Sequence, residues 1–178
     1  GEGEVFIAGG VESMSRAPYS LPKSTKMRGH LTAWDTTLGW RYPHAMFEEL
    51  GYTIPLGETA ENLAEKFGIT REQQDAFALE SHRRAVAAID EGKFGEEICA
   101  ISLSQPKGEP IVFATDVRPR RDTSLEALAR LKPTFRSTGT VTSGNASGLN
   151  DGAAALLVMS EEKAQTLGLQ PMVRILST

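Results

Sequence analysis

The sequence predicts an α/β protein, because short apolar runs of strand length alternate with longer segments of helical periodicity. Two apolar runs, Val5–Ala8 and Leu156–Met159, have the length and composition of strands. Between them, residues 58–92 carry apolar side chains at helical spacing, interrupted by a single glycine at position 68. A chain of 178 residues with 40% hydrophobic residues has the composition of a globular protein.

The N-terminal third combines one predicted strand with a long irregular segment. Val5–Ala8 is predicted to be a buried strand that turns sharply at Gly9 and Gly10. Residues 16–57 show no sustained period and contain four prolines, so we expect an irregular, partly packed excursion.

Two helices are predicted in the centre of the chain. Glu58–Phe67 has helical spacing, and Gly68 is a natural C-terminal stop. Thr70 and Gln73 form a capping box that begins a second helix, which ends near Gly92. The residues expected on the buried face of this helix are Phe77, Ala78, Ser81, Ala85, Ala88 and Ile89.

The C-terminal half is predicted to mix short strands and helices. Glu97–Leu103 and Pro110–Thr115 read as a hairpin across a turn at residues 107–109. Thr123 and Glu126 form a second capping box before a short helix that extends to residue 131. The remaining predicted elements are a strand at 153–159, a helix from Ser160 to Leu167 that Gly168 ends, and a last strand at 172–178.

Composition narrows the functional classes. The net charge of −4 gives no reason to expect nucleic-acid binding, and no apolar run approaches the roughly 20 residues that span a bilayer. A single cysteine, Cys99, excludes an intrachain disulfide framework and suits a reducing compartment, which points to the cytoplasm. Apolar strands near both ends, without partners to cover them, indicate an internal piece of a longer protein.

A run rich in glycine, asparagine and serine, residues 140–155, leads directly into the second apolar run. Its glycines and asparagines could simply tolerate a tight turn. A polar loop held by a core strand can equally present backbone N–H groups and hydroxyls, here those of Ser143 and Ser147, to a ligand.

Basic residues gather upstream of this loop. Such a cluster is usually a solvated face, but arginine also suits phosphate through its planar fork. The basic members are Arg118, Arg120, Arg121, Arg130, Lys132 and Arg136, set against Asp116, Asp122 and Glu126.

Cys99 and the histidines give no further site. Cys99 alternates with Ile101 and Leu103, so we expect it in a core as a small apolar residue and not as a nucleophile. His82 is expected to be exposed in the middle of a helix, and no histidine spacing predicts a metal site.

Three segments together resemble the thiolases, enzymes that make or cleave 3-ketoacyl-CoA thioesters. They are Ala-Gly-Gly-Val-Glu-Ser-Met-Ser at 8–15, Pro-Leu-Gly-Glu-Thr-Ala-Glu-Asn at 55–62, and the glycine-rich run at 140–155. The resemblance covers essentially the whole chain and implies the five-layered α-β-α-β-α thiolase fold. It places residues 1–17 at the end of the first core segment and 18–149 in a loop domain that covers coenzyme A (CoA). Residues 150–168 then return to the first half, and 169–178 open the second.

The resemblance also implies two-step acyl transfer. In the family a cysteine activated by a histidine forms an acyl-enzyme, a second cysteine handles the α-proton, and oxyanion holes hold the developing charge. None of these catalytic groups matches a residue here, so this chain is expected to bind CoA and to be inactive alone. The CoA-binding positions that the resemblance implies are Ser147 at the pantetheine arm, Arg120 beside the nucleotide, Phe135, Ser143, Leu149 and Leu56.

Some positions depart from the family pattern. Leu56 replaces the usual methionine and Pro55 a histidine of some members, which leaves the acyl preference open among acetoacetyl, longer 3-ketoacyl and 3-oxoadipyl groups. Ala127 stands where some relatives have a CoA-contacting serine. The expected ligands are CoA and acyl-CoA as substrates, with no tightly bound cofactor and no metal.

The expected assembly is a homodimer or homotetramer, with no nucleic-acid or membrane partner. Two alternatives stay open: a thiolase-like CoA- or lipid-binding protein without catalysis, and an unrelated α/β binding domain.

Overall fold

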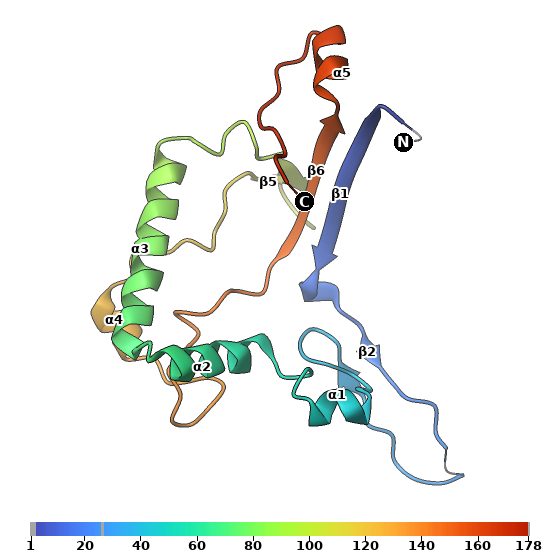
Figure 1. Ribbon diagram of the computed structural model, residues 1–178, viewed down its shortest axis with the longest axis vertical. Coiled ribbons are helices and arrows are strands. Elements are labelled where there is room, and N and C mark those ends of the chain that lie inside the picture. Colours follow the sequence, from blue (N-terminus) through green and yellow to red (C-terminus); the bar gives the residue numbers. More distant parts are fainter. Residues whose placement is uncertain (1–2, 26, 178) are drawn as a thin grey trace. The chain divides into compact units, whose positions relative to one another are not determined.

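The computed structural model describes residues 3–25 and 27–177 of the chain, which divides into two compact units (Figure 1). Unit 1 consists of Gly1–Thr37 and Leu149–Thr178, and unit 2 is the continuous segment Leu38–Gly148. Within the described residues, no helix is both long and apolar enough to cross a membrane.

Unit 1 is built on an antiparallel pair of strands, β1 (Val5–Ser13) and β6 (Asp151–Met159). The register runs from Val5 opposite Met159 to Ser13 opposite Asp151, so the two strands pair over their whole length (Figure 1). The predicted turn at Gly9 and Gly10 is wrong, because both glycines lie inside β1. A Cβ at Gly9 would lie 2.8 Å from the Ala154 carbonyl oxygen, so glycine allows close approach of the two strands there.

The side chains of this sheet are exposed, so the prediction of buried strands is also wrong. Ile7 is 82% exposed and Leu156 67%, because each strand has only one neighbour and the described structure covers neither face. The strand predicted at 172–178 does not form over residues 172–177, which have no strand assignment. Thr178 lies outside the described residues.

The other elements of unit 1 are short. The predicted helix after β6 is confirmed as α5 (Glu161–Thr166), with the Ser160 hydroxyl accepting the Lys163 N–H at 3.2 Å and Gly168 at φ 67°. The remainder comprises the 3-10 helix η1 (Met14–Arg16) and a small pair of strands, β2 (Tyr19–Ser20) and β3 (Trp34–Asp35).

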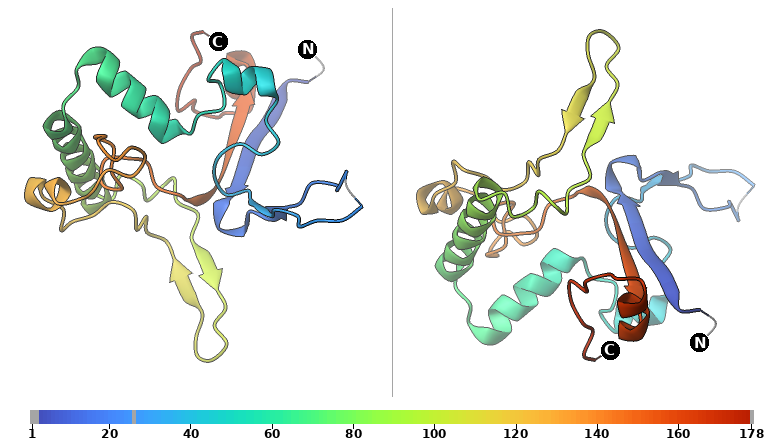
Figure 2. Two further views of the ribbon diagram at one scale, coloured as in Figure 1. Left: turned by 90° about the horizontal axis from the view of Figure 1, so that it is seen from below. Right: turned by 90° about the horizontal axis from the view of Figure 1, so that it is seen from above.

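Most of the regular secondary structure of unit 2 is helical (Figure 2). The predicted helices of the central segment are confirmed as α2 (Leu56–Phe67) and α3 (Arg71–Asp90), preceded by the short α1 (Ala45–Glu49). Gly68 ends α2 in the left-handed conformation at φ 63°. The capping box is present, because the Thr70 hydroxyl accepts the Gln73 N–H while the Gln73 side chain accepts the Thr70 N–H.

The buried face of α3 differs from the prediction. Phe77 is 80% exposed, whereas Asp75 and Leu79 are 4% and 6% exposed. Hydrogen bonds decide which face is buried, because the Asp75 carboxylate accepts them from Arg71 on α3 and from Asn145 in the glycine-rich run. The periodicity of apolar residues cannot reveal such bonds. The described buried apolar residues of this unit are Ala64, Leu79, Leu128 and Val141.

The predicted hairpin and second capped helix form, with shifted limits. The strands β4 (Ile101–Leu103) and β5 (Ile111–Phe113) pair antiparallel. Cys99 precedes β4 and is exposed, so its predicted core position is wrong, because ladder pairing begins only at Ile101. The short helix is α4 (Leu125–Ala129), and its N-cap is Ser124 instead of Thr123, with the hydroxyl accepting the Ala127 N–H.

Candidate functional site

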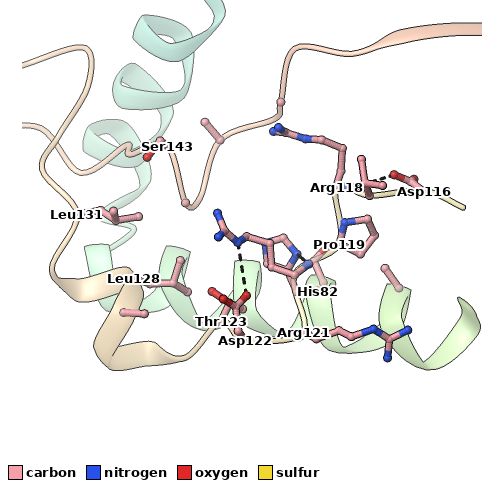
Figure 3. A pocket seen from close by; sticks show the side chains of 18 residues that line it. His82, Asp116, Arg118, Pro119, Arg121, Asp122, Thr123, Leu128, Leu131 and Ser143 are labelled. Carbon is pink, nitrogen blue, oxygen red and sulfur yellow. Dashed lines mark hydrogen bonds and ion pairs between the residues drawn. The ribbon is translucent and has the colours of Figure 1, made fainter. Parts of the chain in front are cut away.

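Unit 2 contains a pocket of about 1070 Å³ between α3, α4, the segment 116–123 and the glycine-rich run (Figure 3). Leu128 and Leu131 form an apolar part of its wall, and Ser143 adds a hydroxyl from the run. Arginines and aspartates of the segment 116–122 supply charge. A cavity of this size, with a few convergent polar groups, is typical of a site for a small-molecule ligand.

The part of the glycine-rich run that lines the pocket is fixed by its own hydrogen bonds. The Asn145 side-chain oxygen accepts the Thr142 N–H at 2.7 Å, and its amide donates to the Thr140 carbonyl at 3.1 Å. Gly144 passes close over the apolar wall, where an added Cβ would lie 2.6 Å from Leu128 Cδ2. Thr142 is fully buried, so the turn is part of the core and not a loose loop.

A buried carboxylate holds the beginning of this turn. Glu61 on α2 is 4% exposed, and it accepts the Val141 N–H at 2.8 Å and the Thr140 N–H at 2.9 Å. The Thr140 hydroxyl donates to the same carboxylate at 3.1 Å. Burial by itself would raise the pKa of Glu61, but these three donors and the Arg136 charge outweigh it and lower the pKa. Glu61 is therefore held as a carboxylate.

A second buried carboxylate ties the turn to α3 and α4. Asp75 accepts the Asn145 side-chain amide at 2.9 Å and the Arg71 guanidinium at 2.8 Å. Arg71 also donates to the Leu128 carbonyl in the last turn of α4, at 2.6 Å, and to the Leu131 carbonyl just after the helix, at 3.1 Å. Hydrogen bonds thus join α3, α4 and the turn around the Asp75 and Arg71 side chains.

Two of the arginines at the pocket already have carboxylate partners. Arg121 binds Asp90 through two hydrogen bonds of 2.8 and 2.6 Å, which lower the pKa of Asp90 and raise that of Arg121. Arg120 lies 3.6 Å from Asp122 in an exposed ion pair. Exposed ion pairs of this kind contribute little to stability.

His82 lines the pocket from α3, which the sequence interpretation missed. Its side chain is half-buried, and Nδ1 accepts the backbone N–H of Arg120 at 3.2 Å. This bond uses the Nδ1 lone pair as its acceptor. The helical spacing of His82 with Ala85 on one face was the available signal, but nothing in the sequence places residues 116–121 against that face.

The guanidinium of Arg118 lies directly against Gly148. A Cβ at this glycine would overlap with the guanidinium, so the close approach depends on the absence of a side chain. The Arg118 backbone N–H donates to Asp116 at 3.0 Å, which fixes the start of the side chain. Arg118 thereby connects the basic segment with the glycine-rich run.

The structure brings together two of the six predicted binding residues at the pocket. Arg120 and Ser143 both line it. Ser147 is exposed between two lining residues, Ala146 and Gly148, and Ala127 also faces the pocket. Leu149 belongs to unit 1 and is 51% exposed.

The other two predicted residues, Leu56 and Phe135, lie outside the pocket. The Phe135 ring lies against Gly57, where any Cβ would overlap with it, and Leu56 is the adjacent helical residue. Leu56 is 85% exposed and Phe135 38%, and neither lines the pocket.

Arg136 has a structural position and not the phosphate-facing one that the basic cluster suggested. It donates to Glu58 at 2.7 Å and to Glu65 at 3.4 Å, and it also bonds the Asn62 side chain. The hydrogen bond with Glu58, together with nearby carboxylate charge, raises the pKa of Arg136 against the effect of burial. Within the described ranges, no three His, Cys, Asp or Glu side chains are grouped as metal ligands.

Comparison with known proteins gives a consistent result. The sequence profile of the family described as "Thiolase, N-terminal domain" matches residues 1–162. An acetyl-CoA acetyltransferase of Pseudomonas aeruginosa is 51% identical over 99% of this chain and 44% of its own length. A beta-ketoadipyl-CoA thiolase of Acinetobacter baylyi is 47% identical over 100% of this chain and 45% of its own length.

Solved structures show the same relationship. The crystal structure of the Bacillus anthracis acetyl-CoA acetyltransferase superposes with a TM-score of 0.80 at 46% identity, over 94% of this chain and 41% of that one. Human mitochondrial 3-ketoacyl-CoA thiolase, solved in complex with CoA, gives a TM-score of 0.79 at 36% identity, over 94% and 40%. The chain spans less than half the length of these relatives.

Proposed function

Because this chain belongs to the thiolase family, we propose that it forms the CoA-binding part of an enzyme that transfers acyl groups between CoA and 3-ketoacyl-CoA. The reaction would run as thiolytic cleavage or as the reverse Claisen condensation. Relatives named for acetyl and for beta-ketoadipyl substrates match almost equally well, which supports the reaction class without selecting an acyl chain.

The observation that carries the proposal is the pocket of unit 2. It combines arginine side chains, an apolar wall and the hydroxyl of Ser143 on a turn fixed by buried carboxylates. CoA carries phosphates at its nucleotide end and a neutral pantetheine arm, so it needs both cationic and neutral polar contacts. The match with a thiolase solved in complex with CoA supports the same ligand.

Within this proposal, the chain contributes binding and no catalytic group. The family motifs Gly-His-Pro and Cys-x-Gly-Gly-Gly do not occur in its 178 residues. The nucleophilic cysteine, the activating histidine and the second cysteine would come from other parts of the intact protein. Residues 18–149 would form the loop domain that covers CoA, in a cytoplasmic homodimer or homotetramer.

Turnover by the intact protein carrying this sequence tests the proposal. Acetoacetyl-CoA, longer 3-ketoacyl-CoAs and 3-oxoadipyl-CoA are each incubated with CoA, and the shortened acyl-CoA is measured. Cleavage of at least one is expected, and Ser147→Ala should raise the KM for CoA about tenfold or less, the size of one hydrogen bond at a ligand. The control Ser160→Ala changes a helix cap outside the pocket and should leave KM unchanged.

The outcomes separate the two functions that the sequence left open. CoA binding without cleavage of any substrate would favour a thiolase-like binding protein over an enzyme. A KM for CoA that Ser147→Ala does not change would remove Ser147 from the site.

A further inference from the structure

The three arginines of the pocket differ in what their guanidinium groups already bind. From this difference we infer that Arg118 holds a phosphate group of the nucleotide end of CoA, an inference that rests on the proposed function. The resemblance pointed instead to Arg120 beside the nucleotide. The distinction matters because a guanidinium already bonded to a carboxylate has fewer N–H donors left for a ligand.

Arg121 and Arg120 each have a carboxylate partner. Arg121 is engaged by Asp90 with two hydrogen bonds, and Figure 3 shows Arg118 and Arg121 directed to opposite sides of the pocket. Arg120 has the looser partner, Asp122, at 3.6 Å. A phosphate would have to compete with these carboxylates at both residues.

Arg118 lacks such a competitor. Among residues 3–25 and 27–177, no carboxylate pairs with its guanidinium, since Asp116 accepts the backbone N–H and not the side chain. Its planar fork can therefore donate two parallel hydrogen bonds to phosphate oxygens, the geometry for which arginine is suited.

The position of this guanidinium also suits a ligand that extends along the glycine-rich run. Its contact with Gly148 leaves no room for a Cβ, so the side chain lies against the glycine-rich run that carries Ser143 and Ser147. A phosphate on Arg118 would then lie beside a run that can bind the rest of the ligand.

Binding of three ligands to the intact protein and its variants tests this role. The ligands are CoA, 3′-dephospho-CoA, which lacks one phosphate, and pantetheine, which has none. Arg118→Gln should raise the Kd for CoA about tenfold or more, the size of a charge-assisted hydrogen bond, with no change for pantetheine. The Kd of Arg118→Lys for CoA should lie between those of wild type and Arg118→Gln, because lysine keeps the positive charge but lacks the planar fork of arginine.

The matched control is Arg84→Gln, which also removes one positive charge. Arg84 lies on α3 outside the pocket, where it forms an exposed ion pair with Glu80. If Arg118→Gln loses affinity for CoA alone, Arg118 binds the 3′-phosphate. If it loses affinity equally for 3′-dephospho-CoA, Arg118 binds the diphosphate. Both results support the inference. Equal Kd values for CoA in Arg118→Gln and Arg84→Gln, or an equal loss for pantetheine, would overturn it. Wild-type protein that binds none of the three would overturn the proposed function as well.

Discussion

At the scale of single residues, Glu61 shows how an acidic side chain can support a site for an anionic ligand. Its carboxylate faces the N–H groups at the start of the turn and not the pocket, so its charge is satisfied inside unit 2. The N–H donors and the Thr140 hydroxyl are drawn toward it, which orients the turn that carries Ser143. Glu61 is thus a positioning residue.

Glu61→Gln should lower the free energy of unfolding at neutral pH by roughly 1.5–3 kcal/mol, the value of hydrogen bonds to a buried charged group. Glutamine keeps one acceptor oxygen but turns an NH₂ group toward backbone donors. Glu65→Gln is the control, because Glu65 lies on the same helix with its side chain 80% exposed. Urea unfolding of both variants makes the comparison, and equal losses would contradict the role of Glu61.

The difference in unfolding free energy between wild type and Glu61→Gln should depend on pH, with a sign that follows from the pKa of Glu61. The pKa of Glu61 is lowered in the folded state from its usual 4.5, so the unfolded chain binds the proton more readily. The carboxylate's stabilising contribution is therefore complete above about pH 4.5 and is lost as the pH falls through the lower folded pKa. The gap between wild type and Glu61→Gln should narrow over that acidic range.

At the scale of elements, the helices α2, α3, α4 and α5 could be predicted from the sequence. The short α1, inside the segment expected to be irregular, and the surroundings of the strands could not. The Thr70 and Gln73 box, the Ser160 cap and the Gly68 stop are local signals within a few residues of each helix end. Burial of β1 and β6 depends on what covers them, and the buried face of α3 depends on Asp75 meeting Asn145. These are contacts between distant segments, which local periodicity does not encode.

The candidate site divides in the same way. Arg120 and Ser143 could be named from motif position, and both line the pocket. His82 and the free fork of Arg118 follow from how α3 and residues 116–122 meet, so only the structure distinguishes them from a solvated charged face.

The helix α2 offers a test of how closely its first turn is packed. Replacing glycine with alanine in a helix usually stabilises it by about 1 kcal/mol. At Gly57 the new Cβ would overlap with the Phe135 ring, which must shift to admit it. Gly57→Ala should therefore destabilise unit 2 by about 1 kcal/mol, the lower end for overpacking, because the ring is 38% exposed. Thermal unfolding of the variant measures the sign directly.

The companion measurement uses a background without the ring. In a Phe135→Ala protein the overlap disappears, so adding Gly57→Ala should be neutral or stabilising. A stabilising effect of Gly57→Ala in the wild-type background would show that the ring does not restrict this helix.

At the scale of the whole molecule, the buried apolar residues are unevenly distributed between the two units. Of those in the described part of the chain, Ala64, Leu79, Leu128 and Val141 belong to unit 2, whereas unit 1 has Ala164. The long ladder of β1 and β6 satisfies backbone groups but buries little apolar surface, and burial is the main favourable term in folding. Two strands alone are marginally stable in water.

Amide hydrogen exchange on the 178-residue chain should therefore report two different stabilities. Amides of α3 around Leu79 should be the more protected, with β1 and β6 at least about tenfold less protected, which corresponds to an opening free energy lower by about 1.4 kcal/mol. The irregular residues 21–23 serve as the fast-exchanging reference within the same sample. Equal protection of β6 and α3 would mean that the sheet opens only when the whole chain unfolds. The unequal result would locate the rigid part of the molecule in the unit whose pocket we assign to CoA, since a binding site needs a framework that rarely opens.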